Sequence, residues 1–173
     1  MSEISDRLEV STAAQFKALG HPLRHRLLFA LGQEAATISQ LAVALGTAKG
    51  NVAHHLGVLR EAGMVHVTET RQVRGGTEQY YRRSARKFEF VGEGARANNT
   101  VVLQAIAAEL ETDDADPLVL LRNVRLTADQ AAELAATLER MVDDLTDAGP
   151  GESRYGVVVS VYHPRQPQPS AGT

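Results

Sequence analysis

Apolar residues recur every three or four positions in six stretches of the chain, which is the spacing that buries one face of an α-helix. Four of these stretches follow one another between residues 11 and 62. Pro22 marks the start of the second and Gly32 its end, because proline suits the first helical turn and glycine the position after the last. The remaining two predicted helices cover 98–111 and about 18 residues after Thr127.

Polar residues mark where several of these helices begin and end. Two pairs have the spacing of a capping box, Thr37 with Gln40 and Thr127 with Gln130. Gly46 ends the third helix and Thr47 is expected to cap the fourth, so the turn between them is only about three residues long, as in a helix-turn-helix. Such a short turn imposes a large crossing angle. The fourth helix therefore projects one of its faces outward.

The fourth helix divides into an apolar face and a small, polar one when about 100° is allowed per residue. Val52, Leu56 and Leu59 form the apolar stripe and are expected in the core. The opposite side and its flanks carry small or polar residues, namely Lys49, Gly50, Asn51, Ala53, His54 and Gly57. His55 lies beside the core edge. The outward face is thus shaped for the close approach of a partner.

A β-hairpin is predicted after Gly63, with its tip around Gly75 and Gly76. Helices followed by a hairpin with arginines near the tip indicate a winged helix-turn-helix. The fold class is therefore mainly α with a small β-hairpin, plus a helical C-terminal region that ends in a strand over 155–163. We expect three segments: 1–92 as the winged helix-turn-helix domain, 93–163 as a dimerisation or effector region, and 164–173 as a disordered tail.

Charge is distributed unevenly along the chain although the net charge is only −3. Residues 24–87 carry ten Lys or Arg against four Glu, whereas the chain from residue 91 onward carries six Arg against thirteen acidic residues. A basic segment next to an acidic one suggests that a polyanion binds the first and is repelled by the second. Ordinary solvated charge is the alternative explanation.

Composition and motifs exclude several chemistries. The chain has no cysteine, so disulfides, thiolate metal sites and cysteine nucleophiles are excluded. His54 and His55 point about 100° apart on one helix and cannot share an ion, and we expect His21 and His25 to cap or pack. No phosphate loop or nucleophile elbow is present. We expect no enzyme activity, no cofactor and no metal, and the non-basic start MSEISDRLEV with no long apolar run predicts a cytoplasmic protein away from the membrane.

Double-stranded DNA is the partner that these features favour. A projecting helix fits the major groove, where each base pair shows a distinct set of donors and acceptors. We expect base contacts from Lys49, Asn51, Ala53 and His54. Contacts to the phosphate backbone are expected from Thr47, Arg71, Arg74, Arg82 and Arg83, for each of which an ordinary solvated position is the alternative.

Three stretches resemble the ArsR-type winged-helix transcriptional regulators: ALGHPLRHRLLFAL, TISQLAVALGTAKGNVAHHLGVLREAGMV and TRQVRGGTEQYYRR. The resemblance covers about residues 12–90. It implies a dimer with the fourth helix as recognition helix and the hairpin as wing. The cysteines and the C-terminal His/Asp pairs through which many members sense metals are absent here. The longer second half resembles an actinobacterial variant of the family.

The sequence therefore predicts a homodimeric, sequence-specific regulator, a repressor by preference, that binds a palindromic operator. The expected dimer contacts are apolar residues of the first helix and of the second half, namely Phe16, Leu103, Ile106, Leu110, Leu134, Leu138 and Met141. An intrachain core is the alternative role for these residues. Two other functions stay open: a ligand-gated regulator that encloses an unidentified small-molecule effector within 95–163, and a winged helix used only for protein contacts.

Overall fold

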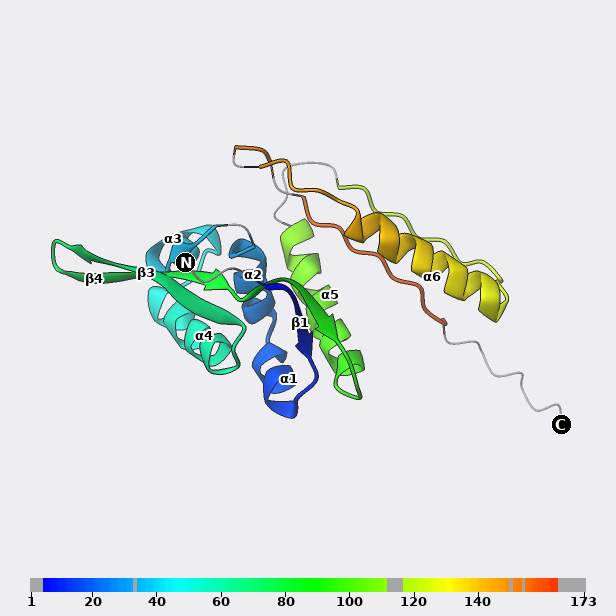
Figure 1. Ribbon diagram of the computed structural model, residues 1–173, viewed down its shortest axis with the longest axis horizontal. Helices are drawn as coiled ribbons and strands as arrows, with labels where there is room; N and C mark the ends of the chain where they lie inside the picture. The colour runs from blue at the N-terminus through cyan, green and yellow to red at the C-terminus, as the bar shows by residue number, and fades with distance from the viewer. Residues whose placement is uncertain (1–4, 33, 112–116, 150, 154, 165–173) are drawn as a thin grey trace. The chain divides into compact units, whose positions relative to one another are not determined.

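The computed structural model describes residues 5–32, 34–111, 117–149, 151–153 and 155–164. The chain divides into two compact units, the first extending to Leu118 and the second starting at Val119 (Figure 1). The first contains the winged helix-turn-helix and one further helix.

Five helices form the first unit: α1 (Ala13–Leu19), α2 (Pro22–Ala30), α3 (Ile38–Ala44), α4 (Lys49–Glu61) and α5 (Ala95–Leu110). Their starts follow local chemistry. The predicted capping box of Thr37 and Gln40 is present at α3, and Thr12 forms another with Gln15 at α1. Pro22 occupies the first turn of α2, as its missing N–H predicts.

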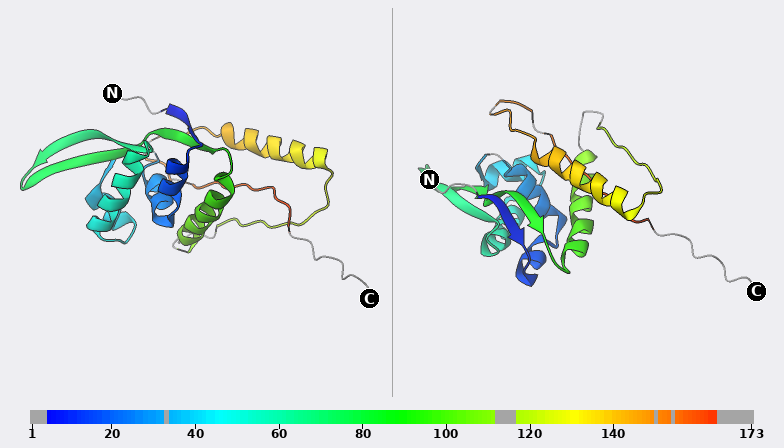
Figure 2. Two further views of the ribbon diagram at one scale, coloured as in Figure 1. Left: turned by 90° about the horizontal axis from the view of Figure 1, so that it is seen from below. Right: turned by 45° about the vertical axis from the view of Figure 1, so that its right-hand side comes forward.

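The predicted wing is an antiparallel hairpin of β3 (Val65–Val73) and β4 (Gly76–Arg83), which extends beyond the helices of this unit (Figures 1 and 2). The short strand β2 (Ala36–Thr37) pairs with β4 and completes a three-stranded sheet. A second sheet was not predicted: β1 (Ser5–Val10) pairs in parallel with β5 (Ala85–Phe90). These two strands lie 80 positions apart in the register Ser5↔Ala85, so no local pattern reveals their pairing.

The core of the first unit consists of aliphatic residues from every helix of the helix-turn-helix. Those with almost no exposed surface are Val10, Leu19, Leu27, Leu31, Leu41, Val52, Leu56, Leu59, Met64 and Val65. Full burial of each such side chain contributes roughly 1.5–3 kcal/mol. The core therefore fixes α4 through its apolar stripe and leaves its other face to solvent.

Helix α5 packs on α2 and α1, so it belongs with the first unit although the predicted segment boundary lay at residue 92. Arg26 of α2 forms an ion pair with Glu109 of α5 through its Nε. At the other end of α5, Gly94 lies directly against the ring of Phe16, where an added Cβ would stand 2.3 Å from a ring carbon. The close approach of α1 to the start of α5 therefore requires glycine at this position.

The second unit contains α6 (Ala128–Asp143), which starts at the predicted capping box of Thr127 and Gln130. Extended segments precede and follow this helix. The prediction of a strand over 155–163 is wrong, because no described residue of that segment pairs with another strand. An alternating or β-branched sequence becomes a strand only when a neighbour accepts its backbone hydrogen bonds. The predicted tail falls outside the described residues from 165 onward.

The helices of the described part of the chain are too short or too polar for a membrane span.

Candidate nucleic-acid interface

The turn between α3 and α4 has four residues, one more than predicted. Gly46 has φ of 60°, a left-handed conformation that favours glycine, and its N–H donates to the carbonyl of Val43 over 3.2 Å. The next N–H, that of Thr47, donates to the carbonyl of Ala42 over 3.0 Å. These two bonds hold the end of α3 and start the chain on its new direction.

The predicted cap of α4 is wrong. Ala48 occupies the N-cap position and supplies no side-chain hydrogen bond. The hydroxyl of Thr47 instead accepts a hydrogen bond of 3.1 Å from the side-chain amide of Asn51. One amide hydrogen of the exposed Asn51 side chain is thereby engaged. Thr47 therefore orients Asn51.

The buried and exposed faces of α4 are those predicted from the helical spacing. Val52, Leu56 and Leu59 are buried, with 0–1% of their surface exposed. The face opposite them, which we call the outer face of α4, consists of Lys49, Gly50, Asn51, Ala53 and His54, all of them exposed. The structure thus brings the four residues predicted to read bases onto one uncovered surface.

The two adjacent histidines of α4 occupy different environments. His54 is exposed, and its ring meets the ring of buried His55 edge-on, with 5.1 Å between centroids. The ring of His21, from the start of α2, lies 4.5 Å from that of His55 on another side. Arg24 of α2 donates from Nη1 to Nδ1 of His55 over 3.2 Å and from Nη2 to the carbonyl of Lys17 over 3.0 Å.

The surroundings of His55 favour its neutral form. Burial, and after it the neighbouring His21, Arg24 and His54, together lower the pKa of His55 to about 4. Since Nδ1 accepts from Arg24, the ring carries its proton on Nε2. His55 therefore acts as a neutral packing group between α2 and α4.

The other pair of histidines caps and packs, as the sequence indicated. Nδ1 of His21 accepts from the N–H of Leu23 over 3.1 Å and caps α2. His25 is buried and donates from Nε2 to the carbonyl of Leu19 over 3.0 Å, and burial lowers its pKa. Among the described residues, no cluster of three or more His, Asp or Glu is arranged to hold a metal ion.

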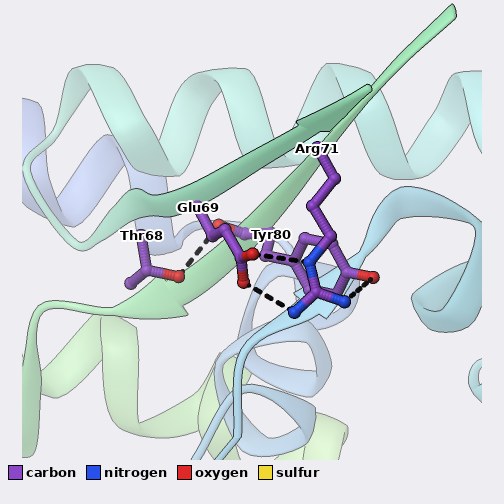
Figure 3. Close-up of polar contacts among 4 residues, drawn as sticks. All are labelled: Thr68, Glu69, Arg71 and Tyr80. Carbon is purple, nitrogen blue, oxygen red and sulfur yellow. Dashed lines mark hydrogen bonds and ion pairs between the residues drawn. The ribbon is translucent and has the colours of Figure 1, made fainter. Parts of the chain in front are cut away.

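Arg71 in the wing is held by its own neighbours (Figure 3). Its Nε and Nη2 donate to the two carboxylate oxygens of Glu69, over 2.5 and 2.9 Å, and its guanidinium lies 4.6 Å from the ring centre of Tyr80. The hydrogen bonds to Arg71 lower the pKa of Glu69, and the same pairing raises the pKa of Arg71. The carboxylate thus offsets part of the positive charge that we predicted would meet a phosphate.

The pairing of Glu69 with Arg71 was not predicted, although the spacing of the two residues in the sequence indicates it. Residues two positions apart in a strand lie on the same face, so Glu69 and Arg71 were candidates for an ion pair. Arg24 was missed as well. Its contact with His55 joins positions 31 residues apart, and nothing in the local sequence indicates it.

The remaining wing arginines lie at two levels of the hairpin. Arg74 is exposed at the tip, next to Gly75, whose φ of 106° suits a tight turn. Arg82 and Arg83 are half-buried at the base of the hairpin, where they pair in register with His66 and Val65. At about 3.3 Å per residue, the base lies roughly 25 Å along the strand from the tip. One phosphate cannot meet both groups.

The residues predicted to form the dimer interface are found in both units. Phe16 is half-buried, because it packs against the core and against Gly94. On α5, Leu103 and Leu110 are exposed and Ile106 is half-buried. On α6, Leu134 and Met141 are exposed and Leu138 is half-buried, and no residue of this helix is buried.

The sequence of α2, α3 and α4 is similar to that of known helix-turn-helix proteins. Residues 19–68 match the model of a family described as a helix-turn-helix domain. The chain is also 43% identical over 67 residues to the HTH-type transcriptional regulator CmtR of Mycobacterium tuberculosis. Residues 19–68 are therefore a helix-turn-helix domain. The match to CmtR covers 38% of this chain and 57% of CmtR, so the chain spans little more than half the length of that relative.

Solved structures of transcriptional regulators are similar to parts of the chain. The transcriptional repressor BigR from Xylella fastidiosa is 29% identical, with 54% of this chain and 81% of BigR covered, at a TM-score of 0.34. An ArsR-like transcriptional regulator from Rhodococcus sp. RHA1 is 23% identical, with 78% of this chain and 92% of that protein covered, at a TM-score of 0.33.

Proposed function

We propose that the protein is a sequence-specific DNA-binding transcriptional regulator that acts as a homodimer and represses from a palindromic operator. The observation that carries this proposal is the outer face of α4, which no described residue of the first unit covers. An exposed helix of this kind can enter the major groove, which is about 12 Å wide. Repression is the expected result when the bound dimer occupies a promoter.

The outer face offers donors and acceptors near the start of α4. Asn51 can present its carbonyl and its second amide hydrogen to adenine, because Thr47 occupies only one hydrogen. Lys49 suits the acceptors of guanine, and exposed His54 lies one turn further along. Gly50 and Ala53 add little bulk, so the helix backbone can come close to the base edges.

The basic residues of the wing supply the contacts to the phosphates. Arg74 at the tip is the strongest candidate, since it is exposed and extends beyond the helices with the hairpin (Figure 2). Arg71 contributes less while Glu69 holds it. Thr47, Arg82 and Arg83 are proposed as further backbone contacts closer to the helices. Such contacts set the orientation of the protein and carry no base information.

A homodimer would present two copies of α4 to half-sites one DNA turn, about 34 Å, apart. We propose that the apolar residues predicted for this role form the interface. The exposed Leu103 and Leu110 of α5 support this proposal, because they stand one above the other two turns apart on a surface helix. Burial of Phe16 within its own subunit reduces its part in the interface.

The test compares Asn51→Ala with Arg74→Ala on selected operator DNA and on random DNA of the same length. Asn51→Ala is expected to weaken operator binding by roughly 1–3 kcal/mol and to leave random DNA unchanged. Arg74→Ala is expected to weaken both about equally, because phosphates are alike in every sequence. Exposed Thr146 in the second unit provides the control, Thr146→Ala.

Equal losses on both DNAs for Asn51→Ala would contradict base readout by α4. Failure of the unmodified protein to select any sequence would contradict the proposed function as a whole.

A further inference from the structure

The second unit has two extended segments that lack strand partners. Segments 119–126 and 155–162 precede and follow α6 (Figure 1), and no described residue of either forms a ladder with another strand. Backbone N–H and C=O groups in folded proteins are almost always paired, and those of an extended chain pair with a neighbouring strand. Both segments therefore present free sheet edges.

Both segments also expose apolar side chains on both of their faces. Leu120 is 84% exposed and Leu121 is 77% exposed, and consecutive residues of an extended chain point to opposite sides. In the other segment Val157, Val158 and Val159 are all exposed. Runs of β-branched and aliphatic residues are typical of strands that are covered on both faces.

Helix α6 leaves its apolar row uncovered as well. Leu134 and Met141 are exposed, and they lie two turns apart on one side of the helix. Within the described residues of one copy, the strand edges and these apolar side chains thus remain uncovered.

The charges of the unit indicate what covers these surfaces. Segment 119–126 contains Arg122 and Arg125 and no acidic residue. Helix α6 carries one arginine and the carboxylates of Asp129, Glu133, Glu139 and Asp143. A nucleic acid would be repelled by the helix. In a second copy of the same unit, the acidic helix can face the basic segment of the first copy, and the apolar surfaces can face each other. The two copies also carry the same number of free strand edges, so these edges can pair between them.

We propose that segments 119–126 and 155–162 become strands of one sheet shared between two copies of this chain. The proposal rests on the homodimer proposed above and adds where the second unit joins it. Strand addition between copies satisfies the backbone groups of the paired edges, and a two-fold axis limits the assembly to two copies.

The absence of cysteine makes a cross-linking test specific. Asn123→Cys and Ser160→Cys each place one thiol near the middle of a segment, at an exposed polar position. Paired strands bring opposite Cβ atoms to about 4.5–5.5 Å, and a short bismaleimide also spans neighbouring registers. We expect each variant, or a mixture of the two, to give a covalent dimer at micromolar protein. Thr146→Cys, in the loop after α6, is the matched control and is expected to stay uncoupled.

Sedimentation provides the second measurement. Leu120→Asp combined with Val158→Asp places charges on both segments and is expected to raise the dimer dissociation constant at least tenfold. The matched control Thr146→Asp is expected to leave it unchanged. Circular dichroism checks that the helices of the first unit remain folded in each variant.

The outcomes separate this proposal from the proposed function. A dimer that binds its operator, resists Leu120→Asp with Val158→Asp and gives no cross-link through either segment overturns the shared sheet and leaves the DNA-binding function standing. A protein that cross-links through the segments and selects no DNA sequence overturns the function and leaves the shared sheet standing. A stable monomer, or open-ended aggregates in place of dimers, overturns the shared sheet.

Discussion

His55 and His54 are neighbours in the chain with opposite surroundings. The first is buried between α2 and α4 and accepts a hydrogen bond from Arg24, and the second is exposed on the outer face. Tertiary packing creates this difference, because burial and three basic neighbours lower the pKa of His55, whereas the ring of His54 remains exposed to solvent. The neutral state of His55 therefore has consequences for stability.

Stability is expected to fall as the pH is lowered from 6.5 to 4. The folded protein takes up a proton at His55 near pH 4, whereas an ordinary imidazole does so at 6.5, so the unfolded chain binds the extra proton throughout that interval. At pH 5 this difference costs about 2 kcal/mol. Urea unfolding at pH 7 and pH 5 measures it, and His55→Gln should lose less stability between the two. An identical loss in both proteins would show that His55 is not the cause.

Glu69 is expected to restrain DNA binding by holding Arg71. Glu69→Gln removes the carboxylate that pairs with the guanidinium and keeps the size of the side chain. We expect tighter binding to any DNA sequence and a salt dependence steeper by up to about 0.9 per subunit, because one more phosphate is neutralised. Gln72→Glu, which adds a carboxylate at an exposed position of the same strand, is the control with the opposite change of charge. Weaker binding by Glu69→Gln would mean that the pair positions the wing.

At the scale of elements, Gly94 and Gly57 differ in the space beside them, although each lies in or next to a helix. Gly94 precedes α5 and touches the ring of Phe16, whereas Gly57 lies within α4 with open space where a Cβ would stand. The difference comes from what packs beside each position, because neither glycine has a positive φ.

Gly94→Ala is expected to destabilise the protein by roughly 1–3 kcal/mol, because the new methyl group displaces the Phe16 ring. Gly57→Ala is expected to stabilise it by about 0.5–1 kcal/mol, because alanine loses less backbone freedom in a helix. Thermal unfolding of both variants measures the two effects. A loss of stability in Gly57→Ala would contradict the open surroundings of that position.

At the scale of the whole molecule, each of the two subunits in the proposed dimer contains a basic domain and an acidic region. Arg74 from both subunits would neutralise at least two phosphates. The logarithm of the binding constant is then expected to fall by at least about 1.8 for each tenfold rise in salt. DNA-binding titrations at salt concentrations between about 50 and 200 mM measure this slope. A slope near zero would favour a winged helix that binds only proteins.

The sequence by itself determined the elements whose signals are local. Helical spacing, the capping boxes at Thr37 and Thr127, and Pro22 at the start of α2 predicted helices that the structure confirms. The spacing of Val52, Leu56 and Leu59 likewise fixed which face of α4 is exposed. These predictions succeed because a helix satisfies its own backbone hydrogen bonds and exposes its pattern within a few residues.

Only the tertiary structure decided the features that join distant residues. The pairing of β1 with β5, the contact of Arg24 with His55, and the close approach of Phe16 to Gly94 each depend on segments far apart in the chain. Segment 155–163 has the composition of a strand, but no strand in the described part of the chain pairs with it. A strand is completed by a neighbour, and the identity of that neighbour is not written in its own sequence.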